Sequence, residues 1–228
     1  MTVNYFLLGL GAAVFLGIFI HYLIKFIKHK SLYPFMPFKY NFRRRRVTFA
    51  KTLELLSDRK AKTIIETGTS REGLRATRGD GAGTFVFGKW AMQNNAKLFS
   101  VDIDKDAVQE CKIEVENQNL EGTVTVILDD SLNFLANYED PVDFLYLDSY
   151  DYSRTDTAIQ VASQEHHLKE FQAIESKLHK NTIVLVDDCG LPGGGKGKTV
   201  VSYMEQKGWE VLIDAYQILL VHQDSVKG

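Results

Sequence analysis

A doubly wound α/β domain is predicted from three features of the sequence. Helical and strand patterns alternate from Val47 onward, one of the strands is nearly all apolar, and the last two strands follow each other with almost no gap. Alternation of this kind is typical of a mostly parallel sheet with helices on both faces. Five strand–helix units and a final hairpin predict a seven-stranded sheet, and the tight hairpin requires one antiparallel strand.

Each expected element has its own pattern. The expected strands are short apolar runs at 62–66, 97–103, 123–128, 142–147, 182–186, 209–215 and 217–222. The expected helices lie at 49–56, 83–94, 105–118, 131–137, 165–178 and 198–207, and most have apolar residues at helical spacing. The run TIVLV at 182–186 is nearly all apolar, as expected for a parallel strand that is covered on both faces.

The composition excludes several classes of protein. Of the 228 residues, 45% are hydrophobic and 25% are charged, which is ordinary for a globular domain with an appendage. The net charge of -2 does not predict a nucleic-acid partner. Cys111 and Cys189 lie far apart and do not suggest a disulfide framework. We therefore expect two reduced thiols, as in a cytosol-like compartment.

An apolar stretch precedes the domain. From Tyr5 to Ile24 only His21 is strongly polar, and about 20 apolar residues are enough to cross the ~30 Å core of a bilayer. A cleaved signal peptide is the alternative, but it would have a charged start and a shorter apolar run. The expected organisation is a transmembrane anchor at 1–28, a basic juxtamembrane linker at 29–46 and the domain at 47–228. Because basic residues follow the apolar stretch, the positive-inside rule favours a single-pass membrane protein with a cytoplasmic domain.

Four consecutive arginines, Arg43 to Arg46, end this linker. They could contact anionic lipid headgroups, at about 1 kcal/mol per charge near the surface. They could instead form an arm that binds nucleic acid. The neighbouring apolar stretch favours the first interpretation, so no nucleic-acid partner is expected.

The residues that follow each strand form the candidate site, because doubly wound sheets bind ligands outside the carboxyl ends of their strands. Glu66-Thr67-Gly68-Thr69 follows the first strand, and a small residue there lets a ligand approach the backbone. A glycine-rich segment at 79–84 opens the next helix, whose free N–H groups could bind a carboxylate. The dinucleotide pattern G-x-G-x-x-G does not occur in the first turn, which counts against a nicotinamide cofactor.

Acidic residues follow the next two strands. Asp102 ends the second strand, where a carboxylate can accept hydrogen bonds from both hydroxyls of a ribose. Asp129 and Asp130 follow the third strand and could contact an adenine amino group. Asp130 or Ser131 could equally cap the helix that begins there.

Further acids follow the fourth and fifth strands, namely Asp148, Asp187 and Asp188. Carboxylates that are packed together need a cation or a proton between them. Oxygen ligands favour Mg²⁺, Ca²⁺ or Mn²⁺, although helix caps and solvated acids would also account for these residues. His166 and His167 lie between these strands and could supply a general base, or could be exposed near the start of a helix.

A glycine-rich loop at 193–199 looks like a phosphate-binding loop but does not match its spacing. Pro192 stands where the first glycine is required, and the segment follows the fifth strand instead of the first. Nucleotide hydrolysis is therefore not expected. Lys196 or Lys198 could contact an anionic substrate, or the loop could serve only as a connection to the last helix.

Read in order, the segments ETGT, VDID, LDD, LDSYD and VDDCG resemble the motifs of class I S-adenosylmethionine (SAM)-dependent methyltransferases over residues 62–223. The resemblance implies a Rossmann-like fold and a SAM-dependent enzyme. Carried over by motif, the SAM-binding residues would be Glu66, Gly68, Thr69, Thr84, Asp102, Asp129 and Asp130.

The acids of the fourth and fifth strands are similar in position to those of metal-dependent small-molecule O-methyltransferases, of the catechol and macrolide-sugar types. That resemblance implies Asp148, Asp187 and Asp188 as ligands of Mg²⁺ or another divalent cation. The candidate catalytic residues are Asp148 and, as general base, His167 or its neighbour His166, which lie in a stretch that is longer than in the catechol type. The expected reaction is O-methylation of a small-molecule or sugar-like acceptor. A nicotinamide-dependent oxidoreductase and a non-catalytic, membrane-associated methyltransferase-like module are the alternatives.

Overall fold

Seven strands form a single sheet in the part of the chain that the computed structural model describes, which is residues 11–21, 23, 42–79 and 81–225. The strands are β1 (Thr63–Thr67), β2 (Lys97–Asp102), β3 (Val124–Leu128), β4 (Val142–Leu147), β5 (Leu178–Val186), β6 (Trp209–Asp214) and β7 (Ile218–His222). Their order is β3-β2-β1-β4-β5-β7-β6, and only the pairs that involve β7 are antiparallel. The predicted sheet with its terminal antiparallel hairpin is confirmed.

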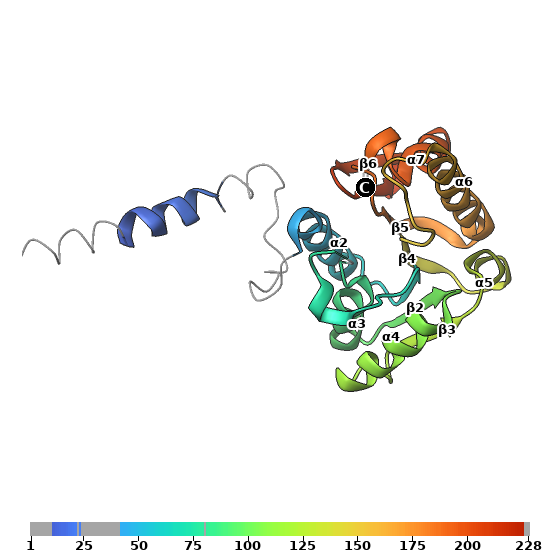
Figure 1. Ribbon diagram of the computed structural model, residues 1–228, viewed down its shortest axis with the longest axis horizontal. Coiled ribbons are helices and arrows are strands. Elements are labelled where there is room, and N and C mark those ends of the chain that lie inside the picture. The colour runs from blue at the N-terminus through green and yellow to red at the C-terminus, as the bar shows by residue number, and fades with distance from the viewer. Residues whose placement is uncertain (1–10, 22, 24–41, 80, 226–228) are drawn as a thin grey trace, which may run out of the picture.

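Helices cover both faces of this sheet (Figure 1). They are α2 (Arg46–Asp58), α3 (Gly83–Asn94), α4 (Lys105–Asn117), α5 (Ser131–Asn137), α6 (Thr157–Ile174) and α7 (Gly197–Gln206), with short 3-10 turns η1 (Arg43–Arg45), η2 (Gly73–Ala76), η3 (Glu175–Lys177), η4 (Pro192–Gly194) and η5 (Gln223–Ser225). One buried cluster includes Phe49 of α2 and Phe87 of α3, and a second includes Phe171 of α6 and Val200 of α7. The two clusters are the cores on the opposite faces of a doubly wound sheet.

Three helices begin at an aspartate that caps their free N–H groups. Asp104, Asp130 and Asp156 accept hydrogen bonds from backbone N–H groups in the first turns of α4, α5 and α6. The capping alternative for Asp130 is thereby confirmed. Because of the Asp156 cap, α6 begins at Thr157, well before the start expected at 165. The strand β5 also begins earlier than expected, at Leu178 instead of 182.

The expected membrane anchor falls only partly on described residues. Residues 11–21 and 23 are helical, and the remainder of the apolar stretch lies outside the described part of the chain. Within that part, none of the helices combines the length and the apolar character needed to cross a bilayer.

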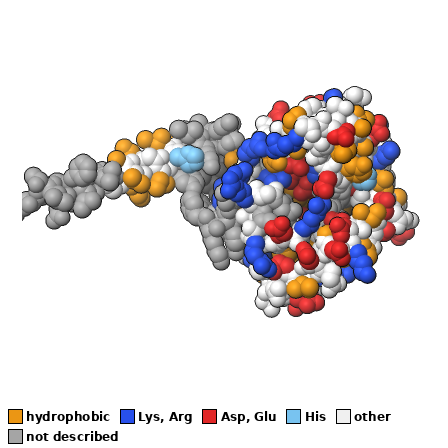
Figure 2. Space-filling model, in the orientation of Figure 1, with side chains coloured by type: hydrophobic (Ala, Val, Ile, Leu, Met, Phe, Trp, Pro, Cys, Tyr) orange, Lys and Arg blue, Asp and Glu red, His pale blue; other side chains and the backbone are white. Residues whose placement is uncertain are grey.

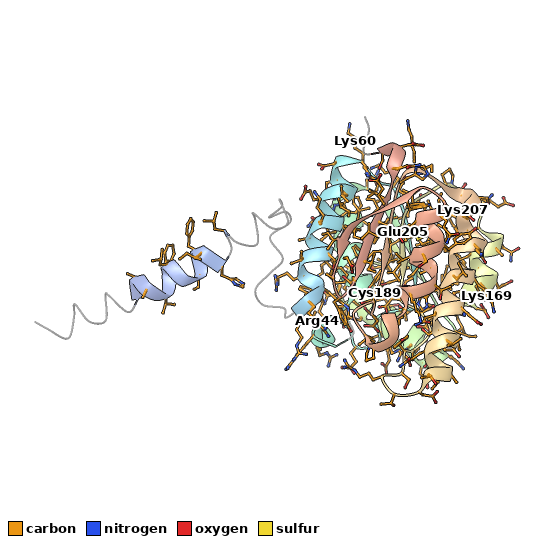
Figure 3. All side chains as sticks on the ribbon, turned by 90° about the horizontal axis from the view of Figure 1, so that it is seen from above. Arg44, Lys60, Lys169, Cys189, Glu205 and Lys207 are labelled. Carbon is orange, nitrogen blue, oxygen red and sulfur yellow. The ribbon has the colours of Figure 1, made fainter. Side chains whose placement is uncertain are left out.

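The expected boundary between the linker and the domain cuts through a folded element. η1 and α2 contain all four arginines of the run at 43–46, and Arg45 is buried. Figure 3 shows Arg44 near the start of α2 and Lys60 beyond the far end of the same helix. The arginine run is therefore built into folded elements that pack on the domain, while residues 29–41 of the expected linker lie outside the described part of the chain.

Candidate functional site

A cavity of about 660 Å³ opens at the carboxyl ends of the parallel strands. A volume of this size suits a nucleotide-sized ligand. Seven residues predicted for the site lie in its wall, namely Glu66, Gly68, Thr69, Asp102, Asp130, Asp148 and Asp188. The other four predicted residues, Thr84, Asp129, Asp187 and His167, lie outside the wall as the structure describes it.

Glu66 is fixed at the floor of the cavity by two hydroxyl groups. Its carboxylate is buried at the end of β1 and accepts hydrogen bonds from Thr84 Oγ1 and Ser100 Oγ, both at 2.6 Å. Thr84 Oγ1 also accepts a hydrogen bond from the backbone N–H of Ser70 at 3.0 Å. Thr84 thus holds the acid and the loop after β1 in place, and does not itself reach the cavity.

Gly68 lies where two strand ends come closest together. Its φ is +82°, and a Cβ added to it would lie 2.5 Å from the carbonyl oxygen of Asp148. Any side chain would therefore push β1 away from β4. The glycine thus lets the loop after β1 pack against the start of the loop after β4. The approach of a ligand to this backbone stays a prediction.

Asp102 is oriented by backbone groups at the end of β2. Its Oδ2 accepts a hydrogen bond from the N–H of Thr69 at 3.0 Å, and its Oδ1 accepts one from the N–H of Asp104 at 2.9 Å. The carboxylate remains partly exposed in the wall of the cavity. Since an oxygen of an ionised carboxylate accepts more than one hydrogen bond, Asp102 keeps capacity for the hydroxyls of a ligand.

The three acids predicted as metal ligands do come together, but two basic side chains lie between them. Arg45 Nε donates to Asp187 Oδ2 at 2.7 Å, and Arg45 Nη2 lies 3.2 Å from Asp188 Oδ1. Lys196 Nζ lies 2.8 Å from Asp148 Oδ1 and 3.6 Å from Asp188 Oδ2. Across the described residues, no three His, Cys, Asp or Glu side chains are arranged to hold a metal ion. The residues therefore do not fit the expected divalent cation, because the protein's own cations neutralise these carboxylates.

Two tyrosines complete this cluster. The hydroxyl of Tyr146 lies 2.6 Å from Asp187 Oδ2 and 3.2 Å from Asp148 Oδ2, and the hydroxyl of Tyr216 donates to Asp188. Every carboxylate of the cluster therefore has both a cationic and a hydroxyl partner. These ion pairs and hydrogen bonds offset the cost of packing three acids at one edge of the sheet.

The acids of the cluster differ in their affinity for protons. Burial by itself would raise the pKa of Asp187, but the charges of Arg45 and Lys196 outweigh burial and hold that pKa below its usual value. Burial and the nearby charge of Asp187 raise the pKa of Asp148 well above its usual value. Asp148, which lies in the cavity wall, is therefore the acid of the pair that accepts a proton more readily.

Of the two neighbouring histidines, the structure places His166 at the cavity and His167 in the interior. His167 is fully buried, its Nδ1 lies 2.7 Å from the carbonyl oxygen of Ser163, and burial lowers its pKa to about 4. That position does not suit the general base predicted there, and it also rules out an exposed side chain. His166 lies in the wall, with its Nε2 3.2 Å from Ser131 Oγ. The two side chains diverge because consecutive helical residues point about 100° apart.

Comparison with known proteins decides the class of this domain. Residues 78–189 match a family model described as a methyltransferase domain, and this match includes the ends of β2 to β5. The chain carries a class I SAM-dependent methyltransferase domain. The sheet order and the geometry at the strand ends agree with the motifs that suggested this family.

Solved structures share the fold of this methyltransferase domain at low sequence identity. The SAH-bound methyltransferase PaMTH1 of Podospora anserina has a TM-score of 0.57 at 14% identity, over 79% of this chain and 80% of that one. The O-methyltransferase TomG of Streptomyces achromogenes, involved in tomaymycin synthesis and in complex with SAM, has a TM-score of 0.52 at 14% identity, over 77% and 79% of the chains. At these identities the likeness shows the fold alone. No curated protein matches the sequence significantly.

Two residues of the methyltransferase site were missed or left undecided by the sequence. Arg45 was assigned to the membrane linker, and nothing in a run of four arginines distinguishes the one that turns inward. The sequence did not decide between Lys196 and Lys198 as the lysine that contacts the site. Lys196 is flanked by Gly195 and Gly197, and this flanking could have distinguished it.

Proposed function

We propose that this methyltransferase transfers the methyl group of SAM to a hydroxyl oxygen of a small-molecule or sugar-like acceptor. The observation that carries the proposal is that one cavity joins Asp102, at the end of β2, to Asp148, at the end of β4. A carboxylate that suits a ribose and a carboxylate that can accept a proton thus face the same space.

Different residues of the cavity would bind the cofactor and accept the proton in this reaction. SAM supplies a methyl group on a sulfonium, which is already a good leaving group. Asp102 would bind the ribose hydroxyls, and Asp130 would lie beside the adenine. As the acceptor oxygen bonds to the methyl carbon, the bond from that carbon to sulfur breaks, and the hydroxyl proton passes to Asp148. The raised pKa of Asp148 favours this proton transfer.

The proposal is tested with the full chain and labelled SAM. S-adenosylhomocysteine should raise the melting temperature, because a ligand that binds only the folded state stabilises it, while NAD should leave the melting temperature unchanged. Methyl-labelled SAM, incubated with a panel of catechols, hydroxycinnamates and sugars, should label at least one of them. A chain that binds neither SAM nor S-adenosylhomocysteine would be the non-catalytic module instead.

Asp102→Ala should weaken the binding of SAM by about 30-fold. The change removes a charged acceptor of hydrogen bonds, which contributes about 2 kcal/mol. It also releases the N–H of Thr69, so the loop after β1 loses one of its contacts. Calorimetric titration with S-adenosylhomocysteine measures the effect. Asp106→Ala, an exposed acid in the first turn of the adjoining α4, is the matched control and should bind as the unmodified chain does.

We propose in addition that the chain is held at a membrane by its apolar N-terminal stretch, with the methyltransferase domain on the cytoplasmic side. The support is the apolar composition between Tyr5 and Ile24 and the basic residues that follow it. The full chain should stay in the membrane fraction after alkaline extraction. Leu16→Arg should weaken this retention, since an arginine at the centre of a span costs about 3 kcal/mol, whereas Leu16→Ala should not. Release of the unmodified chain by alkali would contradict the anchor.

No nucleic-acid partner is expected, and this stays a prediction. Acidic and basic side chains are intermixed on the face of the domain shown in Figure 2, in keeping with the near-neutral net charge. Binding to nucleic acid in general depends on a concentrated positive surface.

A further inference from the structure

The glycine-rich loop between β5 and α7 is built to bring one lysine into the acid cluster. Gly195 has a φ of +57°, and a side chain there would overlap the carbonyl oxygen of Asp188. A Cβ on Gly197 would lie 2.5 Å from Cys189 Sγ. The glycines on both sides of Lys196 thus let the loop pack directly against the end of β5, and this packing accounts for the glycine-rich sequence of the loop.

The same loop is held from the opposite side by α6. Gln164, a buried residue of that helix, donates through Nε2 to the carbonyl oxygens of Gly193 and Gly195, at 3.2 and 3.1 Å. The hydroxyl of Tyr152 donates to the carbonyl oxygen of Pro192 at 2.7 Å. Because these contacts fix the loop on two sides, the ammonium of Lys196 is held at the acid cluster instead of extending into solvent.

The Lys196 ammonium occupies the space between two acids that would otherwise share a metal ion. It is only 3% exposed, contacts Asp148 through both the carboxylate and the backbone oxygen, and lies in the cavity wall beside Asp188. A Mg²⁺ ion needs several oxygen ligands at about 2.0–2.1 Å in octahedral geometry. An ammonium 2.8 Å from Asp148 Oδ1 competes with an ion for that oxygen and repels a second cation beside it.

We infer that this methyltransferase works without a divalent cation, and that the Lys196 ammonium supplies the positive charge that faces the acceptor oxygen. The inference rests on the proposed methyl transfer and extends it. Three carboxylates meet two cations, Lys196 and Arg45. The Lys196 ammonium directs two of its three N–H donors at Asp148, so the third can turn toward a ligand in the cavity. As the acceptor hydroxyl loses its proton to Asp148, Lys196 stabilises the negative charge that develops on the oxygen. A metal performs this task in the O-methyltransferases that the sequence resembles.

The binding of Mn²⁺ tests the inference without any knowledge of the acceptor. The full chain, titrated with Mn²⁺ up to about 1 mM, the weak end of protein sites for divalent cations, should show no saturable binding in the electron paramagnetic resonance signal. Lys196→Gln removes the ammonium and leaves the carboxylates, so it should bind Mn²⁺ at least about tenfold more tightly than the unmodified chain. Lys198→Gln, an exposed lysine of the same segment, is the matched control and should show no gain.

The outcomes separate this inference from the proposed function. Saturable binding of Mn²⁺ by the unmodified chain, lost in Asp188→Asn, would overturn the inference while S-adenosylhomocysteine still bound. A folded Lys196→Gln chain that gains no Mn²⁺ would also count against it. If Lys196→Gln does not fold, the titration of the unmodified chain decides, and Lys196→Arg, which keeps the charge, should fold and remain free of metal. Failure to bind S-adenosylhomocysteine would instead overturn the proposed function.

Discussion

Arg45→Ala should lower the free energy of unfolding by about 3–5 kcal/mol, because removal of one partner leaves a buried charge uncompensated. Asp187 is fully buried and accepts a hydrogen bond from Arg45 Nε at 2.7 Å, and Asp188 loses its guanidinium partner as well. The melting temperature should fall by about 10 °C or more. Thermal unfolding of the full chain, followed by circular dichroism in one fixed detergent condition without ligand, measures the change.

The neighbouring arginine supplies a matched control. Arg44 is exposed, and its guanidinium lies over the ring of Tyr216 at 4.0 Å from the centroid. Because this side chain is exposed and pairs with no buried carboxylate among the described residues, Arg44→Ala should change the melting temperature little. Arg45→Lys should give an intermediate loss, since an ammonium keeps the charge but cannot bridge two carboxylates in the same geometry. Equal, small shifts for Arg44→Ala and Arg45→Ala would show that the buried ion pairs do not stabilise the domain.

The position of Arg45 links the segment after the apolar stretch to the chemistry of the domain. η1 carries it to the edge of β5, where it contacts the acids beside the cavity. A membrane anchor attached through this segment would therefore lie close in sequence to a residue on which the site depends. Lipid contact by the exposed arginines of the run and ion pairing by the buried one are compatible, because they use different side chains of one turn.

The strand-end acids were predictable because a parallel sheet imposes their convergence. Glu66 pairs in register with Ser100 of β2 and Tyr146 of β4, so the ends of β1, β2 and β4 reach the same edge. Short apolar runs followed by an acid locate those ends to within a residue or two. This reasoning needs only the period of the strands and the rule that crossover connections return to the same edge.

The partners of those acids were not predictable in the same way, because they arrive from distant parts of the chain. Arg45 and Asp187 are separated by 142 positions, and no local pattern relates them. The histidines were placed differently for another reason. The helix was expected to begin at 165, next to them, whereas α6 begins at Thr157 behind its Asp156 cap, so both histidines lie well inside the helix. Given the correct start, the burial of His167 follows from its place beside Phe171 on the inner face, one helical turn apart.

Asp148→Asn should reduce the rate of methyl transfer by about 10²- to 10⁴-fold, the usual contribution of a positioned general base, with the affinity for S-adenosylhomocysteine about unchanged. Asparagine keeps the shape of the side chain but cannot accept the hydroxyl proton. In the unmodified enzyme the rate should rise with pH as Asp148 loses its proton, and because its pKa is raised well above the usual value, the rise should lie at higher pH than for an ordinary carboxylate. The variant should lack this rise.

Asp140→Asn is the matched control for this prediction, because Asp140 is an exposed acid just before the opposite end of β4. It should retain the full rate and the same pH profile. If Asp148→Asn lost ligand binding and turnover to the same extent, Asp148 would position the cofactor instead of moving a proton. A variant with an unchanged rate would remove Asp148 from the reaction. The proton of the acceptor would then pass to another group, and His166, which also lines the cavity, has a suitable side chain.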